Sequence, residues 1–141
     1  MFTISKPLRI GDCAPCGIAY FPSYLNILVW VLEEFFASLG LPWRAMNGER
    51  RISVPTVRLD LTFRSPGFQG DELDSRSRSA IARSPRDLQH AVSATDAVLW
   101  TAKHRIVTTS IDTNASPAWP DAIRATQKQQ LEMPHAHDPA T

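Results

Sequence analysis

Reactive side chains are concentrated in one short segment near the amino end of the chain. Asp12, Cys13 and Cys16 lie close together, and Gly11 and Gly17 flank them. A carboxylate can activate water as a general base, and two thiols at C-x-x-C spacing can form a redox pair. We therefore expect any catalytic or ligand-binding chemistry of this chain to centre on this segment.

The two cysteines are not predicted to form a redox centre. A thioredoxin-like pair opens its helix directly, whereas residues 17–22 separate Cys16 from the next predicted helix. Redox catalysis is kept only as a minor alternative. Two thiols fall two ligands short of a structural zinc site, and His90 and His104 lie on separate predicted strands without ligand spacing, so no metal site is predicted.

The segment lies between two elements that would position it. Residues 3–10 are predicted to form a strand, and residues 24–39 are predicted to form one long helix. Ser23 is the predicted N-cap, and Gly40 followed by Pro42 ends the helix. Apolar side chains go nearly all round this helix, which predicts that other structure covers it.

Four further strands are predicted after the helix. The first alternates apolar and polar side chains, the pattern of a half-buried strand. The predicted strands are residues 53–64, 72–82, 88–94 and 97–111. One helix followed by consecutive antiparallel strands predicts an α+β domain over residues 1–125, with residues 126–141 as a polar, frayed tail.

The composition fits one globular domain with a balanced charge. The chain has 141 residues, of which 43% are hydrophobic and 21% are charged, and its formal net charge is +1. This balance predicts no nucleic-acid or membrane partner. Residues 1–12 lack the pattern of a secretory signal, so a cytoplasmic location is expected.

Residues 9–24 (RIGDCAPCGIAYFPSY) resemble the active-site loop of the 4-hydroxybenzoyl-CoA thioesterase family, which reads approximately R-F-G-D-C-D-P-A-G-I-V-x-Y-P-x-Y. Residues 40–42, 70–73 and 117–124 resemble further segments of that family. The order of the predicted elements is also similar to the hotdog fold. The resemblance implies a hotdog domain with a five-stranded antiparallel sheet wrapped around one long central helix, and acyl-CoA thioesterase activity.

The resemblance also assigns roles to residues of the loop. The position of the family's catalytic aspartate is occupied here by Ala14, which leaves Asp12 as the nearest carboxylate to position or activate water. Asp12 has an alternative role as a loop carboxylate that accepts backbone N–H bonds. Phe21 and Gly17 would shape the oxyanion site. Substrate contacts are expected from Ala14, Pro15, Tyr20, Pro22, Tyr24, Arg83 and Arg86, the two arginines binding coenzyme A phosphates.

Two functions follow as expectations. The first is an acyl-CoA thioesterase, with aromatic acyl groups among the candidates, that forms a homodimer or homotetramer and takes coenzyme A only as part of its substrate. The second is a non-catalytic hotdog protein that binds an acyl-CoA or other acyl ligand, and Ala14 favours it. A hotdog hydratase would need a histidine in the loop as its acid or base, and residues 1–64 contain no histidine.

Overall fold

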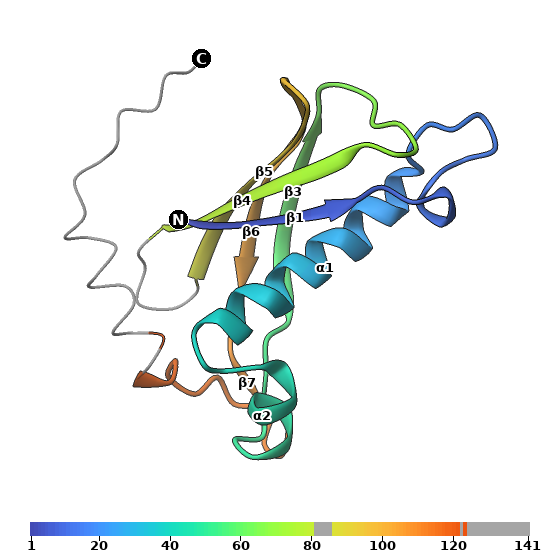
Figure 1. Ribbon diagram of the computed structural model, residues 1–141. Coiled ribbons are helices and arrows are strands. Elements are labelled where there is room, and N and C mark those ends of the chain that lie inside the picture. Colours follow the sequence, from blue (N-terminus) through green and yellow to red (C-terminus); the bar gives the residue numbers. More distant parts are fainter. Residues whose placement is uncertain (81–85, 122, 124–141) are drawn as a thin grey trace.

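The computed structural model describes residues 1–80, 86–121 and 123, and its main feature is a five-stranded antiparallel sheet with a long helix packed on one face (Figure 1). In spatial order the strands are β1 (Phe2–Pro7), β4 (Glu72–Ala80), β5 (Arg86–Ala94), β6 (Ala97–Ile106) and β3 (Thr56–Phe63). Every neighbouring pair is antiparallel. The predicted α+β class with five antiparallel strands is confirmed. β1 and β3 are the two edges of the sheet.

The helix α1 (Phe21–Ser38) begins earlier than predicted. Its N-cap is Tyr20, whose backbone is extended. Pro22 occupies the first turn, where a backbone N–H would have no acceptor within the helix, so the missing N–H of proline costs no hydrogen bond. Ser23 is therefore a buried helical residue and not the cap. The predicted stop at Gly40 is confirmed. Gly40 has a φ of +77°, and Leu41 N–H donates to Phe36 O at 3.0 Å, which together form a Schellman end.

One face of α1 is buried against the sheet. Its buried side chains are Ser23, Tyr24, Ile27, Leu28, Val31, Leu32, Phe35 and Phe36. The opposite face is not covered by the described residues, because Val29 is 46% exposed and Glu33 and Glu34 are exposed. The expectation that structure covers the helix all round is therefore not met by the part of one copy that the structure describes.

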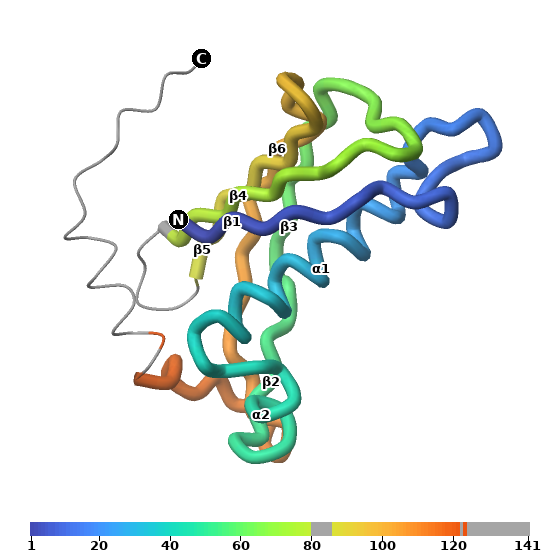
Figure 2. Tube along the Cα trace, viewed as in Figure 1, coloured from blue at the N-terminus to red at the C-terminus, as the bar shows by residue number. Residues whose placement is uncertain are grey.

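The core has two parts along α1. Tyr24, Leu28 and Trp100 belong to the part near the helix start, and Leu32, Phe36 and Trp119 belong to the part near its end. Each fully buried side chain of this size contributes about 1.5–3 kcal/mol. Sequence reasoning missed α2 (Trp43–Gly48), which adds Met46 to the second part. Figure 2 shows α2 and the nearby β2 at the carboxyl end of α1.

Two predicted strands are divided in the structure. The predicted strand at residues 53–64 separates into β2 (Ile52–Ser53) and β3 around Pro55, which cannot donate a ladder hydrogen bond. The predicted strand at 97–111 separates into β6 and β7 (Thr109–Ser110), and β2 pairs with β7 as a small second sheet. β1 ends at Pro7, before a short 3-10 turn. Residues 81–82 of the predicted β4 and the predicted boundary at residue 125 lie outside the described residues.

No helix within residues 1–80, 86–121 and 123 combines the length and the apolar character that crossing a membrane requires.

Candidate active site

The segment between β1 and α1 folds as a compact hairpin. It opens with the 3-10 turn η1 (Ile10–Asp12), and Cys13 and Ala19 then pair as an antiparallel bridge. Ala14 N–H donates to Ile18 O at 2.8 Å, and Gly17 N–H donates to Ala14 O at 2.9 Å. Pro15 therefore occupies the second position of a tight turn that begins at Ala14. Gly17 has a φ of +84°, a conformation that favours glycine.

The connection between β3 and β4 holds this hairpin in place. Ala19 N–H donates to Gly67 O at 2.8 Å, and Gln69 N–H donates to Gly17 O at 2.9 Å. Ile18 and Phe68 form a further bridge between the two segments. In Figure 1 the two connections lie beside the start of α1. The hairpin is therefore fixed to the sheet as well as to the helix that follows it.

Tyr24 anchors the start of α1 beneath the hairpin. Its ring is 4% exposed and lies between Phe63, at a centroid distance of 6.2 Å, and Trp100, at 5.7 Å. A Cβ added to Gly67 would lie 2.5 Å from Tyr24 Oη, so only glycine leaves room for the hydroxyl. Burial raises the pKa of Tyr24, which keeps the phenol neutral. This position makes Tyr24 a packing residue in the single chain.

The first backbone donor of α1 is free to bind a ligand. Ser23 N–H donates to Tyr20 O at 2.9 Å, and Pro22 has no N–H. Phe21 N–H has no acceptor among the described residues, and it lies at the positive end of the helix dipole. A backbone donor of this kind can polarise a carbonyl oxygen or stabilise an oxyanion.

Two carboxylates flank the hairpin, and both hold the backbone. Asp12 Oδ2 accepts Arg9 N–H at 3.0 Å, which is the alternative loop role considered for this residue. Asp71 Oδ2 accepts Phe68 N–H at 2.9 Å. Besides burial, the negative charges of Asp12 and Asp71 both contribute to raising the pKa of the Cys13 thiol. Sequence reasoning did not select Asp71, although the Gly70-Asp71 segment was among those that resembled the family.

The environment of the Cys13 thiol does not favour redox chemistry. Cys13 is partly buried and Cys16 is exposed, and both are free. Burial, followed by the negative charge of Asp12, raises the pKa of the Cys13 thiol, which disfavours the thiolate. The minor redox alternative gains no support from this arrangement.

Aromatic side chains are exposed around the start of α1. Tyr20, Phe21, Phe63 and Phe68 are each more than half exposed. Phe21 packs edge-to-face on Phe63 with a centroid distance of 6.4 Å, and Tyr20 lies 6.0 Å from Phe21. An apolar patch of this kind beside polar loop groups is typical of a ligand or partner surface.

Arg86, one of the two arginines predicted to bind phosphate, is buried against Trp119. Arg86 is 1% exposed, its guanidinium lies 5.3 Å above the Trp119 ring, and its Nη2 donates to Ile123 O at 3.3 Å. Burial lowers the pKa of Arg86 to about 10. This buried position argues against the predicted contact between Arg86 and a solvent-exposed phosphate. Arg83 lies outside the described residues.

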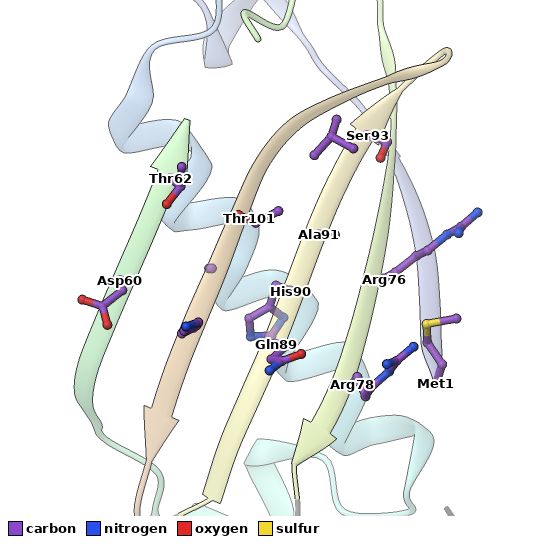
Figure 3. A pocket seen from close by; sticks show the side chains of 13 residues that line it. Met1, Asp60, Thr62, Arg76, Arg78, Gln89, His90, Ala91, Ser93 and Thr101 are labelled. Atoms are coloured by element: carbon purple, nitrogen blue, oxygen red, sulfur yellow. The ribbon is translucent and has the colours of Figure 1, made fainter. Parts of the chain in front are cut away.

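A separate hollow of about 580 Å³ lies across the outer face of the sheet, and Arg76, Arg78 and Gln89 are among the residues that line it (Figure 3). The helix α1 lies behind the sheet in this view. Arg76 and Arg78 are exposed, and neither takes part in an ion pair among the described residues. The hollow shares no lining residue with the hairpin.

Comparison with known proteins identifies the family. Residues 8–127 match the thioesterase-like superfamily. The 4-hydroxybenzoyl-CoA thioesterase of Pseudomonas sp. (strain CBS-3) is 36% identical over 63 residues, which cover 43% of this chain and 45% of that protein. The 1,4-dihydroxy-2-naphthoyl-CoA hydrolase of Acaryochloris marina is 24% identical over 91 residues, which cover 64% of this chain and 66% of that protein. The chain thus spans less than two thirds of the length of each.

A solved structure supports the same assignment. The 4-hydroxybenzoyl-CoA thioesterase from Pseudomonas sp. strain CBS-3 superposes with a TM-score of 0.79 and 26% identity, over 87% of this chain and 96% of that one. The hotdog fold implied by the sequence resemblance is confirmed. Because the family match covers most of the sequence, the chain belongs to the thioesterase-like superfamily.

Proposed function

We propose that this chain hydrolyses an acyl-CoA thioester to the free acid and coenzyme A at the start of α1. The observation that carries the proposal is the Phe21 N–H, which has no acceptor within the described part of the chain and lies at the positive end of α1, beside a hairpin fixed on two sides. Membership of the thioesterase-like superfamily supports the same reaction class.

In the proposed reaction, a backbone N–H group polarises the thioester carbonyl and a side-chain carboxylate positions the water. The thioester carbonyl oxygen accepts Phe21 N–H, and Gly17 allows the substrate to approach the hairpin backbone closely. Water then attacks the carbonyl carbon and gives up a proton to the Asp12 carboxylate, the C–S bond of the resulting oxyanion breaks, and coenzyme A leaves as its thiolate. Asp12 is the proposed carboxylate for positioning this water, through the oxygen that does not accept Arg9 N–H.

The acyl group would lie against the aromatic patch of Tyr20, Phe21, Phe63 and Phe68. Flat apolar side chains suit an aromatic acyl group. The names of the relatives, a 4-hydroxybenzoyl-CoA thioesterase and a 1,4-dihydroxy-2-naphthoyl-CoA hydrolase, also favour aromatic acyl groups. Pro15, Pro22 and Ala14 would contact the substrate near the thioester, and coenzyme A is needed only as part of that substrate.

The second candidate is a binding protein without turnover. Ala14 favours it, because no carboxylate occupies the first position of the hairpin turn, and Asp12 is already engaged by Arg9 N–H. The same oxyanion site and aromatic patch would then hold an acyl-CoA without activating water.

Hydrolysis of a panel of aromatic and aliphatic acyl-CoA thioesters, followed through the released thiol, distinguishes the two functions. Turnover by the wild-type protein that falls strongly in Asp12→Ala supports the thioesterase. Glu33→Ala is the matched control, because it removes an exposed carboxylate on the uncovered face of α1. Absence of wild-type turnover, together with binding of the intact thioesters, contradicts hydrolysis and supports the binding protein.

A further inference from the structure

Four polar side chains form a continuous chain of contacts across the core face of the sheet, and three of them are buried while the fourth, Thr56, lies on the exposed edge strand β3. Ser77 Oγ on β4 lies 2.8 Å from His90 Nδ1 on β5. His90 Nε2 lies 3.3 Å from His104 Nδ1 on β6, and His104 Nε2 lies 2.7 Å from Thr56 Oγ1 on β3. Ser77, His90 and His104 are at most 4% exposed. We call this set the histidine clasp; it crosses four neighbouring strands and ends at the edge strand β3.

A β-bulge brings Thr56 into the clasp. Thr56 and Leu59 are three residues apart, and in a regular strand their side chains would point to opposite faces. The pairing of β3 with β6 shifts between Thr56 and Arg58, so that Leu59 pairs with His104 and Thr56 pairs with Ile106. The extra residue places both side chains on the same face of the sheet as His104, where Leu59 is partly buried and Thr56 is exposed. Thr56 is thus held to β6 by a side-chain contact at the point where the ladder is irregular.

Among the described residues, the charged side chain that shares the core face of β5 with His90 is Arg86, which is buried and donates through Nη2 to Ile123 O. The neighbours of the rings on their own strands are Leu88, Val92, Ala102 and Ile106, and all four are buried. β4 presents Ser75 and Ser79, and β1 presents Phe2 and Ile4. The buried face of α1 carries one titratable group, Tyr24, whose hydroxyl lies against Gly67. Glu33 and Glu34 are exposed, and Lys6 lies over Trp30.

The hydrogen bonds of the clasp limit the number of protons that its two imidazole rings can bind. A neutral imidazole donates from one nitrogen and accepts at the other, so the chain is satisfied with both rings neutral. One added proton can be accommodated if a terminal hydroxyl turns round. With both rings protonated, two N–H groups would face each other across the 3.3 Å contact between His90 and His104.

We propose that the histidine clasp holds the edge strand β3 on the sheet, and that protonation of both histidine rings in acid breaks this contact and releases the strand. The consequence reaches the other end of β3, where Phe63 packs on Phe21 and Tyr24. Release of β3 would remove one wall of the aromatic patch. The clasp would act in this way whether or not the hairpin is catalytic.

The direction of the pH effect follows from the two histidines. Burial, and then the charge of His104, lower the pKa of His90 to about 3, and burial lowers the pKa of His104. The unfolded chain binds these protons near pH 6.5, so the stabilisation is complete above about pH 6.5 and is lost as the pH falls below it. From about pH 7.5 to about pH 5, the unfolding equilibrium constant should rise about thirtyfold for one excluded proton and about a thousandfold for two.

Urea unfolding at these two pH values tests the clasp in the full chain. The wild type should show a rise between these two limits, and His90→Leu/His104→Leu should show it no longer. His135→Gln/His137→Gln is the matched control, because it removes the other two of the four histidines and should keep the full rise. Hydrogen–deuterium exchange, corrected for intrinsic rates, should accelerate on acidification at β3 more than at β1, the other edge strand.

An equal rise in the leucine variant, or equal acceleration at β1 and β3, overturns the proposal. If the leucine variant does not fold, an NMR titration of the wild-type ring protons decides the question. Rings that stay neutral in the folded protein below about pH 5 support the clasp, and rings that titrate near pH 6.5 overturn it.

Discussion

Among single residues, Ala14 is the one whose replacement is most informative. It occupies the first position of the hairpin turn, and its backbone N–H and C=O are bonded to Ile18 and Gly17. Aspartate and asparagine are favoured at this turn position. The hairpin can therefore accept a carboxylate there without a change of backbone.

We predict that Ala14→Asp raises kcat/KM for acyl-CoA hydrolysis by at least about a hundredfold, the usual contribution of a positioned general base or nucleophile. The control is Ala14→Asn, which has nearly the same shape but cannot act as a base. Equal activity of the two variants would show that a carboxylate at this position does not take part in the reaction. The measurement is release of free thiol at substrate concentrations below KM.

Gly67 is the second informative position, because the Tyr24 hydroxyl fills the space that a side chain would need. We predict that Gly67→Ala lowers the free energy of unfolding by about 1–3 kcal/mol through overpacking. Gly11→Ala is the matched control, since nothing lies within 4 Å of a Cβ added there, and it should change stability by less than about 0.5 kcal/mol. Chemical denaturation of both variants, followed by fluorescence, measures the difference.

Much of the candidate site could be predicted because its residues are contiguous in the sequence. Asp12, Gly17, Phe21 and Tyr24 share one hairpin and one helix start, and their closeness along the chain brings them together. The histidine clasp could not be predicted in this way. His90 and His104 meet only through the register of β5 on β6, in which Leu88 pairs with His104, and sequence spacing alone does not reveal that register.

At the level of elements, the C-terminal end of α1 was predicted correctly from the sequence, whereas its start was not. Gly40 ends the helix because its positive φ is costly for any other residue, which is a strong local signal. The start was misplaced because Ser23 is a favoured N-cap residue, whereas Tyr20 makes no side-chain cap bond and Pro22 fixes the first turn. Tertiary hydrogen bonds of the hairpin, such as Tyr20 N–H to Asp12 O, decide where the helix begins.

The C-terminal end of α1 gives a quantitative prediction. Gly40→Ala should destabilise the protein by about 1–2 kcal/mol, because alanine is disfavoured at a φ of +77° even though nothing lies within 4 Å of the added Cβ. Gly48→Ala, at the end of α2, adds the same methyl group without a positive φ and should be neutral or stabilising. Thermal unfolding of the two variants compares them, and equal losses would contradict the conformational explanation.

For the whole molecule, the surfaces that one copy leaves uncovered suggest how copies associate. β3 is an edge strand of eight residues, and most of its side chains are exposed, including Val57 and Phe63. A long, partly apolar edge is a template for pairing with another chain. The outer face of the sheet is less suited to pairing with itself, because the exposed Arg76 and Arg78 would repel their copies. We therefore propose the β3 edge as the contact in a homodimer or in each half of a homotetramer.

The final prediction concerns this edge. Val57→Asp places a charge on β3, where Val57 is 55% exposed, and should lower the apparent mass in size-exclusion chromatography with light scattering below that of the wild-type multimer, to a single chain if the wild type is a homodimer. Ile111→Asp is the matched control, because it makes the same kind of substitution at a 39% exposed side chain outside the five-stranded sheet and should leave the mass unchanged. A wild type that is already a single chain, or a Val57→Asp variant that keeps the wild-type mass, would exclude the β3 edge as the contact. If the edge does pair, the clasp holds the strand through which copies associate, and acidification should dissociate the wild type in the same direction as Val57→Asp.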